Sequence, residues 1–363
     1  MLLTLIEPTK ATALDMAFTG GIESISPGSF IWLDAYAEEG RIWVPYLAKL
    51  AGLQPLEEHL LDAENSLHSS YYDSTRDYEM IVFRGLALRA AALPKDMVSK
   101  QSTIKIKTRP NTFFIFPRVL VTIRPSDSRS IPAIRERLLS AHVEQYRLPQ
   151  LPEELMLKII NGLVDRYLEL RQSLTDQAEQ WQRLLLDPRK PFSNWNYLLD
   201  ARQEAHKLQS LCEEQLDAMQ EWRDERLERE PRNRRPVQEV SVPLDARMSD
   251  LLEVRVNDIG EHIRRVHSHA ERLERTLESA VQLHFSATSH RTNEVMRVLT
   301  ALTAIFLPLN LITGIFGMNF DVMPLLKNRD GFWFTLGLMM LVALGLIFFF
   351  YIKRYLSSRP RQR

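Results

Sequence analysis

Amide, hydroxyl and glycine residues recur along one apolar segment near the C-terminal end of the chain, three or four residues apart. Oxygen atoms of amides, hydroxyls and backbone carbonyls are the ligands that hard divalent cations such as Mg2+ prefer. Because Mg2+ gives up its water reluctantly, a ring of amide oxygens can hold the hydrated ion through those waters. The stripe consists of Asn293, Met296, Leu299, Thr303, Leu307, Asn310, Gly314 and Gly317.

This stripe follows the spacing of a helix face that packs around an axis with identical neighbours. Asn293 and Asn310 would be costly in lipid, so we expect them to face protein or water. If the face encloses a pore, Met296, Leu299 and Leu307 form apolar constrictions that gate by dewetting. An ordinary helix–helix interface uses the same small and polar residues. The stripe alone leaves both interpretations open.

Two segments contain no charged residue. The first, 298–320, holds the stripe from Leu299 to Gly317, and the second is 331–352. Each has the roughly 20 residues that a helix needs to cross a bilayer. The short connection between them predicts an antiparallel hairpin. Basic residues flank the pair on one side, among them Arg297, Lys353 and Arg354. The positive-inside rule therefore predicts that both termini lie in the cytoplasm and that the protein is a multi-pass component of the cell (inner) membrane.

The rest of the chain predicts an α+β fold. Short apolar runs at 30–34, 78–86, 112–116 and 118–123 indicate strands, and helical stretches lie between them. A charged, helical region from Pro152 to Glu230 breaks near residue 187, which predicts two antiparallel helices. We expect the following segments: a cytoplasmic α/β domain (1–145), an antiparallel helical pair (146–240), a long stalk helix (241–297), the first transmembrane helix (298–320), an external loop (321–330), the second transmembrane helix (331–352) and a basic cytoplasmic tail (353–363).

Composition narrows the function. Lys+Arg and Asp+Glu both number 46, so no basic excess points to nucleic acid. The single cysteine, Cys212, fits a reducing compartment. The chain contains no Gly-rich phosphate loop and no nucleophile–base arrangement, so we expect a protein that is not an enzyme and has no resident cofactor.

The end of the first apolar segment reads Gly317-Met318-Asn319, and Met323-Pro324 follows. Placed between two C-terminal spans, this triplet resembles the signature of the CorA family of divalent metal-ion transporters. The segments 291–300 and 305–309 resemble the family too, as do 30–34 and 132–138.

The resemblance implies a homopentamer in membrane lipid, with the first spans around a central pore and the long helices as a cytoplasmic funnel. It places Asn319 at the outer mouth, Asn293 in a polar ring at the cytoplasmic end and Leu299 at a hydrophobic gate. It also implies regulatory metal binding between neighbouring subunits. The residues concerned would be Asp258 together with Glu57, Glu58 or Asp62, for each of which a solvated helix acid is the alternative.

The identity of the transported ion stays open at this point. We expect Mg2+, with Co2+ and Ni2+ as further cargo, because amide and carbonyl rings lack the sulfur or imidazole ligands that select softer ions. Leu325-Leu326 departs from the Glu-Leu of many magnesium-type members, so a zinc transporter of the ZntB-like branch, with proton coupling, is the alternative. A second alternative for the function is a membrane scaffold without a pore. Histidines could serve zinc, although we expect them on the surface: His59, His262, His267, His269, His284 and His290.

Overall fold

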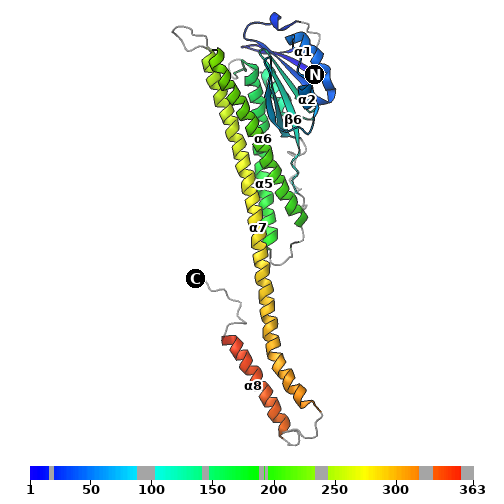
Figure 1. Ribbon diagram of the computed structural model, residues 1–363, viewed down its shortest axis with the longest axis vertical. Helices are drawn as coiled ribbons and strands as arrows, with labels where there is room; N and C mark the ends of the chain where they lie inside the picture. The colour runs from blue at the N-terminus through cyan, green and yellow to red at the C-terminus, as the bar shows by residue number, and fades with distance from the viewer. Residues whose placement is uncertain are drawn as a thin grey trace. The chain divides into compact units, whose positions relative to one another are not determined.

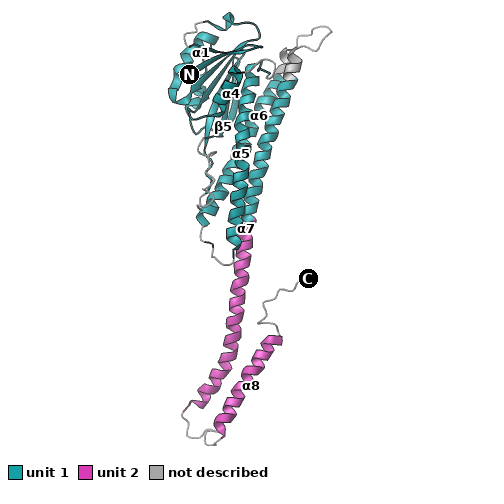
Figure 2. Ribbon diagram, turned by 180° about the vertical axis from the view of Figure 1, so that it is seen from behind, with its two compact units in different colours: residues 1–278 teal, residues 279–363 magenta. Residues whose placement is uncertain are grey.

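The computed structural model divides the chain into two compact units, residues 1–278 and 279–363 (Figure 2). It describes residues 1–15, 20–87, 103–140, 147–187, 192, 195–233, 244–318 and 330–352. For residues 229–233 and 244–249 it describes the backbone alone.

A seven-stranded mixed sheet forms the centre of the N-terminal part (Figure 1). Its order is β2-β1-β3-β7-β6-β5-β4, and only the β3–β7 pair is parallel. The four predicted strands are confirmed, and the last two, β6 and β7, pair as an antiparallel hairpin; β1, β2 and β4 were not predicted. The strands are β1 (Leu2–Ile6), β2 (Ala11–Leu14), β3 (Phe30–Tyr36), β4 (Tyr71–Ser74), β5 (Glu79–Leu86), β6 (Thr108–Phe116) and β7 (Val119–Arg124).

Helices cover the sheet because its central strands are apolar on both faces. One face packs against α1 (Trp43–Ala51) and α2 (Glu57–Glu64) around a shared core. The other faces α4 (Ser130–Leu139) and the long helices α5 (Pro152–Leu186, 35 residues) and α6 (Trp195–Asn233, 39 residues). Two short 3₁₀ helices, Ile22–Ser24 and Ala37–Ile42, complete this region.

Helix α5 packs closely against strand β5 of the sheet at Gly85. A Cβ added to Gly85 would lie 3.0 Å from Leu163 Cδ2 and 3.1 Å from Asn111 Nδ2, so a side chain here would crowd α5 and force these neighbours to shift. The Tyr167 hydroxyl donates to the carbonyl of Arg84 at 3.3 Å. These contacts seat α5 on β5 at the edge of the core.

The predicted antiparallel pair is α5 and α6. Arg226 of α6 meets Glu153 at the start of α5 at 3.1 Å, and Tyr197 at the start of α6 stacks on Trp181 near the end of α5. The two helices therefore run in opposite directions. Their apolar stripes bury Trp181, Cys212 and Trp222 among others, which supplies the core of this layer.

One helix, α7, runs without interruption from Leu244 to Phe316 (73 residues), as the absence of proline between Pro243 and Pro308 predicts. Its first part packs on α5 and α6 in the first unit. Arg255 pairs with Glu154 at 2.8 Å, and Glu274 accepts hydrogen bonds from Arg202 and Gln209 at 3.2 and 3.0 Å. The second unit holds the last part of α7 and α8 (Gly331–Ile352, 22 residues), which run in opposite directions (Figure 2).

Candidate functional site

The predicted stripe lies on one exposed face of α7. All eight positions are exposed in the single chain, with Met296, Leu299 and Leu307 at 55, 56 and 65%. Asn319, predicted at the outer mouth, lies outside the described residues. The described residues of this unit therefore leave the surface of the stripe uncovered from Asn293 to Gly317, over nearly seven turns of α7.

The opposite face of α7 is the one that is covered. At about 100° per residue, the covered positions centre about 180° away from the stripe. Half-buried side chains of α8 also recur every three or four residues. Because α7 and α8 are the two helices described in this unit, we infer that these two faces cover each other. Between residues 291 and 318, the side chains that are not exposed are Ala301, Ala304, Ile305, Pro308, Leu309, Ile312 and Phe316; on α8 they include Thr335, Met339, Val342, Ala343, Leu346 and Phe350.

The remaining surface of α8 is apolar and exposed. Phe332, Trp333, Leu341 and Tyr351 are 68 to 75% exposed. In water so much apolar surface would be strongly unfavourable, whereas hydrocarbon accepts it. Both α7 and α8 are long and apolar enough to cross a membrane. Trp333 and Tyr351 lie near the two ends of α8, where aromatic side chains meet the bilayer interface.

The stripe offers oxygen atoms at several levels. The Thr303 hydroxyl donates to the Leu299 carbonyl at 2.9 Å, so its lone pairs remain available as acceptors. Asn310 carries an exposed amide about two turns further on. No heavy atom lies within 4 Å of a Cβ built on Gly314, so the backbone is open to approach there. Leu299 and Leu307, about one turn before and after Thr303, present apolar side chains.

The C-terminal end of α7 adds a partial negative charge. The helix ends at Phe316, where Gly317 N–H donates to the Thr313 carbonyl at 2.9 Å and Met318 N–H donates to the Ile315 carbonyl at 3.2 Å. The macrodipole makes a helix C-terminus favourable for cations. The end of α7 at Gly317 and Met318 therefore attracts a positive ion electrostatically.

The predicted regulatory acids lie on two elements of the first unit. Glu57 is bound by Arg41 at 2.6 Å, Glu58 is exposed, and Asp62 accepts from the Tyr71 hydroxyl at 2.9 Å. On α7, Asp258 is 61% exposed and lies 3.7 Å from His262. No group of three or more His, Cys, Asp or Glu side chains suited to a metal occurs among the described residues of the single chain. The predicted site between subunits therefore stays a prediction.

The prediction of surface histidines is wrong for two of the six. His59 is 5% exposed and bridges the Tyr78 hydroxyl at 2.8 Å and Asp73 at 3.0 Å. His269 is 8% exposed and contacts the Thr175 hydroxyl at 2.9 Å. Burial, and after it the positive charges of Arg272 and Arg171, lowers the pKa of His269 to about 4. Both imidazoles serve the packing of helices rather than an exposed zinc site.

Comparison with known proteins identifies the class. The family model described as "CorA-like Mg2+ transporter protein" matches residues 27–354, so this chain belongs to the CorA family. The cobalt/magnesium transport protein CorA of Thermotoga maritima is 27% identical over 207 residues, 56% of this chain and 52% of that protein. CorA of Methanocaldococcus jannaschii is 36% identical over 74 residues, 20% of this chain and 23% of that protein. The matched sequence thus spans about half or less of these relatives.

Solved structures share the fold over nearly the whole chain. The complete CorA magnesium transporter of Methanocaldococcus jannaschii has a TM-score of 0.65 at 18% identity, covering 97% of this chain and 98% of that one. Full-length CmaX gives 0.67 at 18% identity, with 98 and 97% covered. The cytoplasmic domain of ZntB from Vibrio parahaemolyticus gives 0.54 at 14% identity, with 81 and 98% covered. At these identities the likeness establishes the α+β fold with two C-terminal apolar helices.

Proposed function

We propose that this chain carries divalent metal cations across a membrane through a homo-oligomeric pore lined by the stripe of α7. The observation that carries the proposal is the division of α7 into two faces. The polar and glycine positions are exposed, and the opposite face is covered. Asn310 and Thr303 would be costly against lipid, so the face of α7 that the second unit leaves open should meet water or other copies of the chain.

Copies of the same chain supply the missing cover. Five first spans around one axis, as in a pentamer, would turn the stripes inward and leave α8 outside against lipid. Asn319 and the end of α7 then hold the hydrated cation at the outer mouth, and Asn293 forms a polar ring at the other end. Met296, Leu299 and Leu307 form the apolar levels where the column of water breaks when the pore is closed. We further propose that the N-terminal unit and both termini lie in the cytoplasm and that the pore crosses the inner membrane.

Magnesium is the proposed cargo, with Co2+ and Ni2+ as further ions. The polar positions in the described part of the stripe, Asn293, Thr303 and Asn310, present amide and hydroxyl oxygens, which suit a hydrated hard ion. Zinc transport is the second candidate. It rests on Leu325-Leu326, which stands where many magnesium-type members have Glu-Leu, and proton coupling would accompany it.

Ion flux into proteoliposomes tests the proposal. Purified protein should accumulate Mg2+ without a pH gradient, and Asn319→Ala should abolish this uptake. Asn328→Ala, an identical change in the segment between the spans, is the matched control and should leave uptake unchanged. Parallel assays with Zn2+, Co2+ and Ni2+, each with and without a pH gradient, rank the ions. Zinc uptake that follows the pH gradient would show that zinc, not magnesium, is the cargo. An intact oligomer without any ion flux would show that the protein is a scaffold and not a transporter.

Regulation by cytoplasmic metal is proposed for Asp258. Carboxylates that converge between copies repel one another, and a bound divalent cation relieves this repulsion. Mg2+ should therefore protect the wild-type oligomer from proteolysis. Asp258→Asn should remove that dependence, whereas Glu253→Gln on the same helix should preserve it. Equal protection of wild type and Asp258→Asn would show that Asp258 is a solvated helix acid.

A further inference from the structure

Four arginines line a pocket on the first unit, away from the stripe of α7. Arg171 comes from α5, and Arg264, Arg265 and Arg272 come from α7. Glu261 and Ser268 complete the lining of a space of about 500 Å3. No sequence motif marks these residues. In a charged helix each arginine looks like an ordinary solvated side chain, and the contribution of α5 becomes visible only in the fold.

The positive charge of this pocket is largely unbalanced. Glu261 accepts a hydrogen bond from Arg265 at 3.3 Å, and both side chains are about 60% exposed, so this ion pair is weak. The guanidinium groups of Arg171, Arg264 and Arg272 form no ion pair with a carboxylate among the described residues. Four positive charges thus surround one negative charge in a chain whose total charge is zero.

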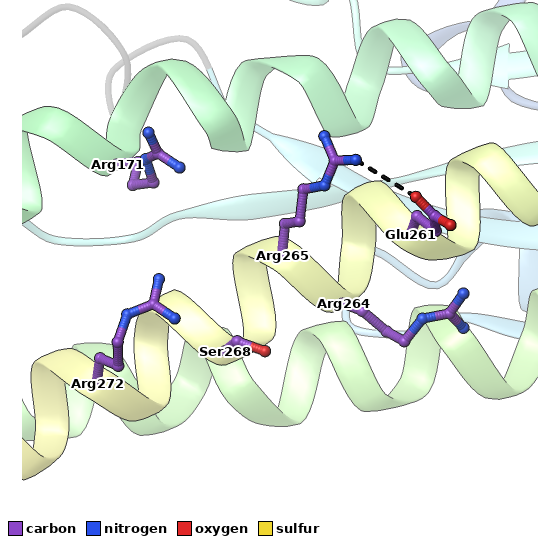
Figure 3. A pocket seen from close by; sticks show the side chains of 6 residues that line it. All are labelled: Arg171, Glu261, Arg264, Arg265, Ser268 and Arg272. Atoms are coloured by element: carbon purple, nitrogen blue, oxygen red, sulfur yellow. Dashed lines mark hydrogen bonds and ion pairs between the residues drawn. The ribbon is translucent and has the colours of Figure 1, made fainter.

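The arginines converge from two helices. Arg171 of α5 and Arg272 of α7 project toward the same gap between the two helices, and Ser268 and the Arg265 guanidinium follow further along α7 (Figure 3). Arg265 and Arg272 are seven residues apart, which corresponds to about 10 Å along a helix. A single phosphate is too short to contact both ends of this row, whereas a chain of linked phosphates reaches from one to the other.

Two further observations fit an anionic ligand. The pKa of His269, adjacent to Ser268 in sequence, is lowered by burial and then by Arg272 and Arg171, so the local field is positive. Twenty-five residues, several of them charged, separate Arg272 from the uncharged run that begins at Val298. The pocket therefore belongs to the water-exposed part of the chain, and its ligand is a dissolved anion rather than a lipid headgroup.

We propose that Arg171, Arg265 and Arg272, with Ser268, form a binding site for a polyphosphate chain, either free or as the triphosphate of a nucleotide. The planar guanidinium fork matches phosphate oxygens two at a time, and the Ser268 hydroxyl donates a further hydrogen bond. Arg264 projects from α7 on the side away from Arg171 and adds positive charge (Figure 3). Glu261 opposes binding, because its carboxylate occupies Arg265 and repels the ligand.

Isothermal titration calorimetry of the full-length protein in detergent tests this site. EDTA is present to remove divalent metal ions that tripolyphosphate or ATP would otherwise bind. Tripolyphosphate and ATP should bind saturably with similar affinity, and inorganic phosphate should bind far more weakly. Arg171→Gln and Arg272→Gln should each weaken tripolyphosphate binding about tenfold, as expected for the loss of a charge-assisted contact. Arg183→Gln, the same change on an exposed arginine of α5 outside the pocket, should have no effect.

The acidic residue provides a test in the opposite direction. Glu261→Gln should tighten tripolyphosphate binding, whereas Glu253→Gln, with the same change of net charge elsewhere on α7, should not. Absence of saturable binding, an equal loss in Arg183→Gln, or binding of ATP without tripolyphosphate would overturn the proposal. So would a change of oligomeric state in Arg272→Gln without a change in anion affinity, because the arginines would then hold a second copy of the chain.

Discussion

Arg124 and Asp34 form a buried, two-pronged ion pair between β7 and β3. The Arg124 Nε donates to Asp34 Oδ1 at 2.9 Å, and Nη2 donates to Oδ2 at 3.0 Å. Both side chains are 2% exposed. The Thr122 hydroxyl also donates to Asp34 Oδ1 at 2.9 Å, and the Arg124 guanidinium lies 4.6 Å from the centre of the Tyr36 ring. This network ties together the one parallel strand pair of the sheet.

Removal of one partner should destabilise the N-terminal unit strongly. Arg124→Ala leaves the Asp34 carboxylate buried without its counterion, which typically costs about 3–5 kcal/mol. Asp34→Leu combined with Arg124→Met removes both charges and fills the space, so most of the lost stability should return. Thermal unfolding of the three proteins checks this. If the double variant is no more stable than Arg124→Ala, the buried charge is not the cause of the loss.

The amide at Asn310 should set the ion flux. Asn310→Leu joins the apolar level at Leu307 to the next turn and lengthens the stretch that water must wet. We expect the rate of Mg2+ uptake into proteoliposomes to fall by at least about tenfold, which corresponds to about 1.4 kcal/mol in the barrier. Asn310→Gln keeps an amide at this level and should retain most of the flux. Equal loss in both variants would indicate a packing defect instead of a change in polarity.

The side chain of Leu307 should act as an apolar barrier. Leu307→Thr introduces a hydroxyl on the stripe and should increase Mg2+ leak under conditions that close the wild-type pore. Leu302 is 48% exposed and lies on another face of α7, about 140° around the helix from Leu307. Leu302→Thr is therefore the matched control and should leave the leak unchanged. A larger leak in the control than in Leu307→Thr would place the pore on a different face.

The helical part of the molecule could be predicted because its signals are local. The absence of proline between Pro243 and Pro308 predicts one helix there, and α7 follows it throughout. The spacing of the stripe separates Leu307 and Asn310 from the covered positions such as Ala301, since a helix face needs only its period to be recognised. Residue types alone thus place the candidate pathway on its helix.

Long-range partners could not be predicted in the same way. Asp34 and Arg124 are 90 residues apart, and no local pattern couples them. The strands β1, β2 and β4, at the two ends of the sheet order, are only four or five residues long, so alternation carries little signal. His59 and His269 stand in charged helical sequence, and only the packing of Tyr78 and Thr175 against them makes them buried.

The hydrogen bonds of His269 predict a loss of stability in acid. The Thr175 hydroxyl donates to the Arg171 carbonyl at 3.0 Å, so the contact at 2.9 Å requires His269 Nε2 to donate its proton to Thr175. Protonation would add charge to a buried ring that faces Arg171 and Arg272. The pKa of His269 is accordingly lowered to about 4 from its ordinary value of 6.5. The unfolded chain therefore binds this proton at a higher pH than the folded chain does.

Stability should consequently fall as the pH drops from about 6.5 to about 4, with a contribution from His269 on the order of 2 kcal/mol. His269→Gln keeps an N–H donor toward Thr175 and does not titrate, so its midpoint of thermal unfolding should depend less on pH in this range. His206→Gln, at an exposed position on α6, is the matched control and should keep the wild-type slope. The predicted effect originates in the buried, neutral imidazole of His269. An unchanged slope in His269→Gln would therefore assign the acid sensitivity to other groups.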